Sequence, residues 1–260
     1  MGGNELKNKL KILLYTVTTF FMILAYKQNV MGIVMQYSTL PNKDFTTSMK
    51  DVNPEKKIIY LTFDDGPSVI TENVLDILKE NNVKGTFFII GNQINGFENM
   101  VKRIHDDGHS IGLHTYTHKF KRIYSSRDAF IKEMLDSQNE INKLTGISPN
   151  IIRFPGGSSK RLTNAFLTKL HSYNFKIYDW NMVTLDGLNP NASPNRLYID
   201  ATKVNEELSS IILLLHCDYM HKNTCKALPS IIKYYKEKGY EFKIISEDTP
   251  ELYFPIKSKL

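Results

Sequence analysis

From Lys57 onward, short apolar segments of the sequence alternate with longer segments of helical periodicity. The apolar segments predict strands at residues 58–63, 85–90, 109–114, 150–154, 175–181, 211–216 and 241–245. The segments between them predict helices near residues 69–81, 97–107, 127–144, 163–172, 201–209 and 226–238. Strands that alternate with helices in this way favour an α/β fold whose parallel sheet closes into a barrel.

The N-terminal segment has the composition of an export signal. Three lysines precede an uncharged apolar run at residues 12–26, and Lys27 closes it. The run is shorter than the roughly 20 residues of a typical membrane-spanning helix, and no clear cleavage motif of small residues follows it. We expect residues 1–27 to form an uncleaved signal-anchor, with a cleaved signal peptide as the alternative. The positive-inside rule then places the rest of the chain outside the cytoplasm, anchored to the membrane.

The remaining residues divide into a linker, one domain and a tail. Residues 28–55 are polar, contain Pro41 and Pro54, and predict an irregular tether. We assign residues 56–250 to a single catalytic domain and residues 251–260 to a C-terminal tail. A chain of 260 residues has ample length for such a domain, which we expect to be a monomer.

Composition excludes few functions. Hydrophobic residues make up 42% of the chain and charged residues 23%, as in an ordinary globular protein. The formal net charge is +6, but the lysines are spread out and form no dense basic run interleaved with aromatic residues. We therefore expect no nucleic-acid partner. The charge fits either attraction to an anionic membrane or cell-wall surface or an excess of solvated lysines.

Two motifs carry residues that can bind a metal. The first predicted strand ends in the motif Thr62-Phe63-Asp64-Asp65-Gly66-Pro67. Farther on, His114 and His118 have a spacing that can place both rings on one face of a helical turn. One aspartate with two histidines is an open ligand set for a catalytic divalent metal, and the second aspartate is then free to act as a base. An Asp-Asp pair before glycine is by itself more often a turn or a helix cap, but the histidine pair favours a metal-dependent hydrolase.

The candidate functional residues share one position, the end of a predicted strand. Along the chain they are Asp64 and Asp65, His114, Arg153, Trp180 and His216. Active groups in α/β barrels gather at the C-terminal face of the strands, because the loops that follow the strands converge there. This common position favours a single active site over core packing.

These motifs resemble those of the polysaccharide deacetylases, the NodB-type domain of carbohydrate esterase family four. The resemblance covers about residues 56–248. It rests on the aspartate motif, the segment His114-Thr115-Tyr116-Thr117-His118, the segment Arg153-Phe154-Pro155-Gly156-Gly157, the region of Trp180, and Leu214-Leu215-His216. It implies a distorted barrel with fewer than eight strands, which agrees with a (β/α)7 arrangement here.

The resemblance implies the roles of the metal-binding motifs. Asp65, His114 and His118 would bind a divalent metal, and Asp64 would be the general base. Zinc is the default metal, although the same ligands suit cobalt, nickel or manganese. Arg153 would hold Asp64 ionised and oriented; the alternative is an ordinary surface arginine before a proline turn.

The resemblance implies further roles around the bond that is cleaved. His216 would be the general acid, and the backbone N–H of Gly156 would face the developing oxyanion. Pro155 would shape that loop. Trp180 and Leu214 would wall the pocket for the acetyl methyl group, although a single tryptophan also fits plain core packing.

One motif departs from the family pattern. The family commonly has Trp-x-x-Asp-x-x-Asp-Trp, and its first aspartate partners the catalytic histidine. In this sequence Val183 replaces that aspartate and Gly187 replaces the second tryptophan. Asp186 or Asp179 is then the candidate partner of His216. Asp186 is slightly favoured because it keeps the family spacing from the tryptophan.

The two cysteines leave three alternatives open. Cys217 and Cys225 lie close in sequence, and in an exported protein they could form a disulfide. Equally, Cys217 could be a buried residue and Cys225 a free thiol. A structural zinc site that includes His221 lacks an obvious fourth ligand.

The sequence as a whole predicts a membrane-anchored, extracytoplasmic, metal-dependent deacetylase. It would remove N-acetyl groups from N-acetylglucosamine-type residues of a glycan and release acetate. Peptidoglycan is the favoured substrate because an anchored domain faces the cell wall; chitin-like oligomers, poly-N-acetylglucosamine and acetylated xylan are alternatives. A catalytically silent glycan-binding barrel is a second hypothesis, and a hydrolase of small non-sugar amides is a third.

Overall fold

The computed structural model describes residues 56–203 and 208–256 of the chain. The expected signal segment at 1–27 and the linker at 28–55 lie outside these residues. The strands are β1 (Ile58–Gly66), β2 (Thr86–Ile89), β3 (Ser110–Leu113), β4 (Ile151–Ile152), β5 (Lys176–Ile177), β6 (Met182–Val183), β7 (Ser210–His216) and β8 (Glu241–Lys243). They form one parallel sheet in the order β5-β4-β3-β2-β1-β7-β6, and β8 pairs with β1. The predicted α/β class and parallel sheet are confirmed. Within the described residues the end strands β5 and β6 do not pair with each other, so the barrel is distorted and open.

The central strand β1 positions the first site residues. Its apolar residues are buried, as expected for a parallel strand that is covered on both faces. β7 pairs along one edge of β1, and this register places His216 opposite Asp64. On the other edge β8 pairs with the first residues of β1 and β2 with the later ones. The register between β1 and β7 therefore brings together two residues that lie far apart in the sequence.

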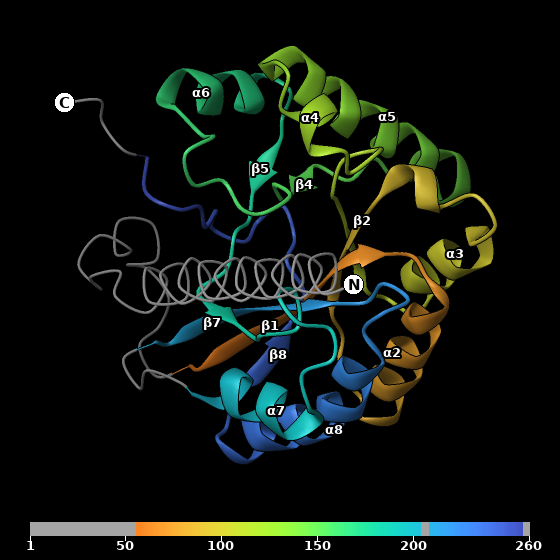
Figure 1. The fold of residues 1–260 in the computed structure, drawn as a ribbon, viewed down its shortest axis with the longest axis vertical. Coiled ribbons are helices and arrows are strands. Elements are labelled where there is room, and N and C mark those ends of the chain that lie inside the picture. The colour runs from red at the N-terminus through yellow and green to blue at the C-terminus, as the bar shows by residue number, and fades with distance from the viewer. Residues whose placement is uncertain (1–55, 204–207, 257–260) are drawn as a thin grey trace, which may run out of the picture. The chain divides into compact units, whose positions relative to one another are not determined.

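Helices lie outside the strands (Figure 1). They are α2 (Val69–Glu80), α3 (Glu98–Asp106), α4 (Phe120–Ile123), α5 (Arg127–Thr145), α6 (Asn164–Ser172), α7 (Pro194–Thr202) and α8 (Lys222–Glu237), with a short 3-10 helix η2 (Gly91–Gln93). Side-chain hydroxyls cap the N-termini of α2, α5, α6 and α7. These caps satisfy backbone N–H groups that the helix itself leaves free.

Two sequence predictions differ from the structure. The strand predicted at 175–181 stops at Ile177, because the carbonyls of Tyr178 and Asp179 accept hydrogen bonds from the Arg153 side chain. β6 then forms separately, so the sheet has eight strands rather than seven. The helix predicted at 201–209 was wrong: α7 begins at Pro194, since a serine caps it and proline fits the first helical position.

The described part of the expected tail packs against the domain. Leu252 forms a parallel bridge with Tyr178, and the Phe254 N–H donates to Asp179 Oδ2 at 2.8 Å. Residues 251–256 therefore contribute to the same unit as the sheet.

The cysteines are two buried, free thiols, so the disulfide alternative was wrong. Neither thiol belongs to a described group of residues that could hold a metal ion, which removes support for the alternative of a structural zinc site. No helix within residues 56–203 or 208–256 combines the length and apolar character needed to cross a membrane.

Candidate active site

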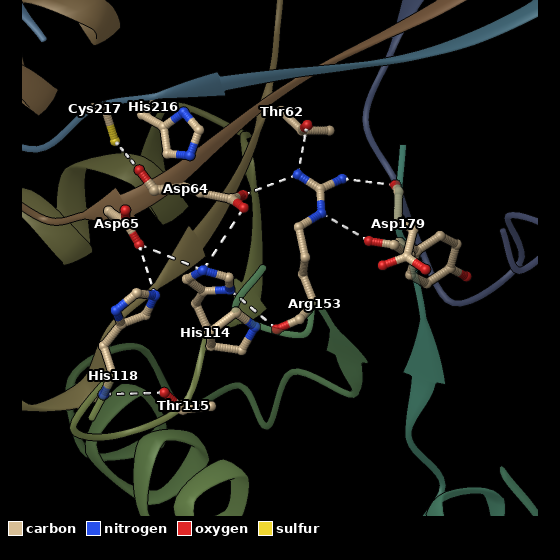
Figure 2. A network of polar contacts seen from close by, with 12 residues as sticks. Thr62, Asp64, Asp65, His114, Thr115, His118, Arg153, Asp179, His216 and Cys217 are labelled. Carbon is tan, nitrogen blue, oxygen red and sulfur yellow. Dashed lines mark hydrogen bonds and ion pairs between the residues drawn. The ribbon is translucent and has the colours of Figure 1, made fainter. Parts of the chain in front are cut away.

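Asp64 and Asp65 lie at the C-terminal end of β1. Successive strand residues ordinarily point to opposite faces. Here the register between β1 and β2 shifts between Asp64 and Gly66, and Asp65 has a left-handed backbone with a φ of 66°. This bulge turns both carboxylates toward the same side, where the two histidines lie (Figure 2).

His114 and His118 lie in a loop after β3 and not on the helical turn that their spacing suggested. The loop contains two left-handed residues, Thr115 with a φ of 69° and His118 with a φ of 53°. Such conformations cost about 1–3 kcal/mol each and persist only where the surroundings enforce them. Glu133 of α5 supplies that enforcement, because its buried carboxylate accepts two successive backbone N–H groups of the loop at 3.0 and 2.7 Å.

Three donor atoms from these segments converge. Asp65 Oδ1 lies 3.4 Å from His114 Nε2 and 3.3 Å from His118 Nε2. This oxygen is buried and has no hydrogen-bond partner among the described residues. His114 Nδ1 lies 3.0 Å from the Arg153 carbonyl oxygen, which leaves Nε2 free to bind a cation. Burial lowers the pKa of His114 to about 3, so its ring is neutral, as a metal ligand must be. The residues therefore fit a divalent metal.

Arg153 holds Asp64 in place. Its fully buried guanidinium donates to Asp64 Oδ1 at 2.9 Å and to Thr62 Oγ1 at 2.7 Å. Its Nε donates to the Tyr178 carbonyl at 2.7 Å. Its Nη2 donates to the Asp179 carbonyl at 3.0 Å (Figure 2). Burial raises the pKa of Asp64, and the charge of Arg153 opposes the rise. The result is a fixed carboxylate that is more basic than an ordinary aspartate.

Asp186 is the carboxylate that contacts His216. Asp186 Oδ1 lies 3.0 Å from His216 Nδ1, and its other oxygen accepts the His216 backbone N–H at 2.9 Å. Burial by itself would lower the pKa of His216, but the charge of Asp186 and this hydrogen bond raise it to about 9. The ring is therefore charged near neutral pH and can donate a proton.

Asp179, the other candidate partner of His216, belongs to a different network. Its Oδ1 accepts the Ser158 backbone N–H at 3.0 Å, and the Ser158 hydroxyl donates to Oδ2. The Phe254 N–H also donates to Oδ2. Asp179 thus ties the loop after β4 to the C-terminal segment.

Gly187, which stands where the family pattern has its second tryptophan, leaves room for the His216 ring. A Cβ at this position would lie 2.5 Å from His216 Cε1, so any side chain would displace the imidazole. His221 also stacks on His216, with ring centroids 5.2 Å apart and planes inclined by 22°. His221 Nδ1 in turn lies 2.7 Å from Asp218 Oδ1. Val183, on β6, is exposed and offers His216 no charge.

The residues expected around the acetyl group lie on neighbouring loops and strands. Gly156 is exposed and has a φ of 70°, a conformation that favours glycine. Before it, the Pro155 carbonyl accepts the Tyr124 hydroxyl at 2.7 Å. Trp180 is partly exposed and meets Phe254 edge to face at 5.2 Å. Leu214 is buried on β7, two residues before His216 and therefore on the same face of the strand.

Sequence reasoning missed Glu133 and Phe254 as residues that support the site, and it considered His221 only as a possible zinc ligand. Glu133 could have been found, because it lies between the buried residues Phe130 and Met134 and so places a charge on the apolar face of a helix. His221 and Phe254 lie in irregular segments, and no periodicity marks them.

These groups can bind a cation, accept a proton and donate one, which defines the site of a metal-dependent hydrolase. The polysaccharide deacetylase family matches residues 51–178. A peptidoglycan-N-acetylglucosamine deacetylase of Bacillus cereus is 34% identical over 210 residues, which span 78% of this chain and 73% of the relative. A chitin deacetylase of Colletotrichum lindemuthianum is 33% identical over 76% of this chain and 82% of its own.

Solved structures agree with these relatives. A Bacillus cereus polysaccharide deacetylase superposes with a TM-score of 0.69 at 33% identity, covering 77% of this chain and 96% of the other. The catalytic domain of a Eubacterium rectale peptidoglycan N-acetylglucosamine deacetylase gives a TM-score of 0.72 at 29% identity, covering 80% and 96%. The chain belongs to the polysaccharide deacetylase family, whose members hydrolyse N-acetyl groups of glycans.

Proposed function

We propose that this protein hydrolyses the N-acetyl group of N-acetylglucosamine residues in peptidoglycan and releases acetate. The observation that carries the proposal is the convergence of Asp65, His114 and His118 on one point beside the buried Asp64. Relatives in Bacillus cereus and Listeria monocytogenes that are named for this activity support the choice of glycan.

Asp65, His114 and His118 would hold the metal, with zinc as the default and cobalt, nickel or manganese as alternatives for the same donors. A divalent cation supplies Lewis acidity, which polarises a carbonyl group and makes water acidic enough to lose a proton near neutral pH.

Asp64 accepts the proton of the attacking water, because Arg153 holds its carboxylate in one orientation. His216, charged through Asp186, donates a proton to the departing amine nitrogen. Activity therefore requires a deprotonated carboxylate and a protonated imidazole together.

The remaining residues position the acetyl group. The Gly156 N–H donates to the developing oxyanion, and its missing side chain permits close approach. Trp180 and Leu214 enclose the acetyl methyl group, and Pro155 shapes the loop between Arg153 and Gly156.

We infer that the domain works outside the cytoplasm, attached to the membrane through residues 1–27, and that it acts as a monomer. The lysines at the start of the chain and the uncharged apolar run at residues 12–26 support the location outside the cytoplasm.

Acetate release from purified peptidoglycan, chitin oligomers and acetylxylan tests the proposal. We expect the full-length protein to release acetate from peptidoglycan. A chelator should stop this release, and added zinc should restore it. Release from chitin oligomers or acetylxylan alone would reassign the substrate. Binding without release from any of the three would favour the silent glycan-binding barrel.

A further inference from the structure

Arg161 is held at the rim of the site by contacts that fix its guanidinium group. Its Nη1 donates to the Gly157 carbonyl at 3.1 Å. The guanidinium carbon lies 4.0 Å from the centre of the Tyr124 ring and 5.4 Å from the centre of the Phe120 ring. Arginine stacked on aromatic rings in this way loses little further freedom when it binds a ligand.

Arg161 and Phe120 border residues that the proposed reaction uses. The Phe120 ring meets the His118 ring edge to face at 5.6 Å, and Phe120 is 45% exposed. A Cβ on Gly156 would lie 3.5 Å from the Phe120 ring and 3.7 Å from Arg161 Nη1. The guanidinium therefore lies beside the backbone that we assign to the acetyl carbonyl.

Within the part of the chain that the structure describes, no acidic side chain neutralises the charge of Arg161. Among residues 56–203 and 208–256, no carboxylate lies within 4.0 Å of its guanidinium nitrogens. Arg122, in the nearby helix α4, instead pairs with Glu133 at 2.7 Å. The Tyr124 hydroxyl donates a hydrogen bond to the Pro155 carbonyl, so it is protonated and cannot neutralise the guanidinium. Only one of the side-chain donors of Arg161 has a partner among the described residues, so a partly exposed fork of N–H groups is available.

We propose that Arg161 and Phe120 form a subsite for a carboxylate-bearing substituent on the sugar next to the N-acetylglucosamine that is hydrolysed. A guanidinium binds a carboxylate through two parallel hydrogen bonds, and an exposed aromatic ring packs on the apolar face of a sugar. In peptidoglycan the lactyl group of the alternate sugar is amide-linked to a stem peptide that bears free carboxylates, whereas chitin carries no carboxylate. The inference rests on the proposed function and identifies the residue that makes this site prefer an acidic glycan.

A matched pair of oligomers tests the subsite. The first is a tetrasaccharide of alternating N-acetylglucosamine and N-acetylmuramic acid whose lactyl groups carry stem peptides with free carboxylates. The second is the same oligomer with the peptide carboxyl groups converted to methylamides. We expect the full-length protein to prefer the acidic oligomer in kcat/KM for acetate release, and Arg161→Gln to remove that preference. The loss on the acidic oligomer should be about tenfold or more, mainly in KM, with less than about a twofold change on the neutral one. Added salt should weaken the wild-type preference.

Two variants serve as controls. Arg127→Gln removes another arginine that lies over an aromatic ring, 5.7 Å from the centre of Phe166, and should leave the preference unchanged. Arg161→Lys keeps the charge and should retain part of the preference. Equal losses of Arg161→Gln on both oligomers, or no loss on either, would overturn the inference. A wild-type protein that releases acetate from neither oligomer would instead overturn the proposed function.

Discussion

Asp186 contacts His216 through both of its carboxylate oxygens, one at the ring Nδ1 and one at the backbone N–H. The side-chain contact sets the charge of the ring, and the backbone contact fixes where β7 ends relative to the loop that carries Asp186. The Thr224 hydroxyl donates to the same carboxylate at 3.0 Å, which adds α8 to the arrangement. One carboxylate thus links three segments around the proposed general acid.

The first prediction is that Asp186→Asn moves the alkaline limb of the pH–rate profile to lower pH. With a pKa of about 9, His216 stays protonated until the pH rises through that value, and the acid form is then lost. Removing the charge of Asp186 lowers this pKa, with an effect on the order of one unit or more. The profile of kcat against pH for acetate release measures the shift.

Asp179→Asn is the control for this prediction. Asp179 accepts hydrogen bonds from Ser158 and Phe254 and does not contact His216, so its variant should lose stability while the alkaline limb stays in place. An unchanged limb in Asp186→Asn would show that the contact does not set the charge of the general acid.

The second prediction is that Gly187→Ala displaces His216. The added methyl group would lie 2.5 Å from His216 Cε1, and overpacking of this kind costs about 1–3 kcal/mol. We expect kcat to fall by about tenfold or more while metal content is retained, because the metal donors lie elsewhere, at the end of β1 and in the loop after β3. Leu188→Ala, at the exposed neighbour, should change little. Full activity in Gly187→Ala would contradict the close packing of the imidazole.

The strand-end residues were predictable from the sequence because parallel strands bring their C-terminal ends to one edge. For the partner of His216 the sequence slightly favoured Asp186, which is the residue that contacts it. It left Asp179 open, because the predicted alternation over 175–181 fails where Arg153 donates to the carbonyls of Tyr178 and Asp179. The spacing of His114 and His118 predicted a helical turn, and this prediction was wrong because a distant contact shapes the loop. Its left-handed residues follow from a buried carboxylate in α5, which local spacing does not reveal.

The third prediction concerns that carboxylate. Glu133→Gln should weaken metal binding by about 10–100-fold, because groups that hold ligand loops contribute by orienting the ligands. Titration of the metal-free protein with zinc, followed calorimetrically, measures the affinity. Glu140→Gln is the matched control, since Glu140 lies on the same helix, is partly exposed and, among the described residues, pairs only with Lys143 at 2.7 Å. Equal affinities for both variants would mean that Glu133 does not hold the metal ligands.

The central claim is that two adjacent aspartates have different roles, Asp65 as a metal ligand and Asp64 as the base. Metal content and acetate release from peptidoglycan, measured on the same samples of wild type, Asp64→Asn and Asp65→Asn, test it most directly. We predict that Asp64→Asn keeps its metal and loses about 10²–10⁴ in turnover, whereas Asp65→Asn loses both metal and activity. Loss of metal in Asp64→Asn, with normal activity per bound ion, together with full metal content in Asp65→Asn, would contradict the assignment.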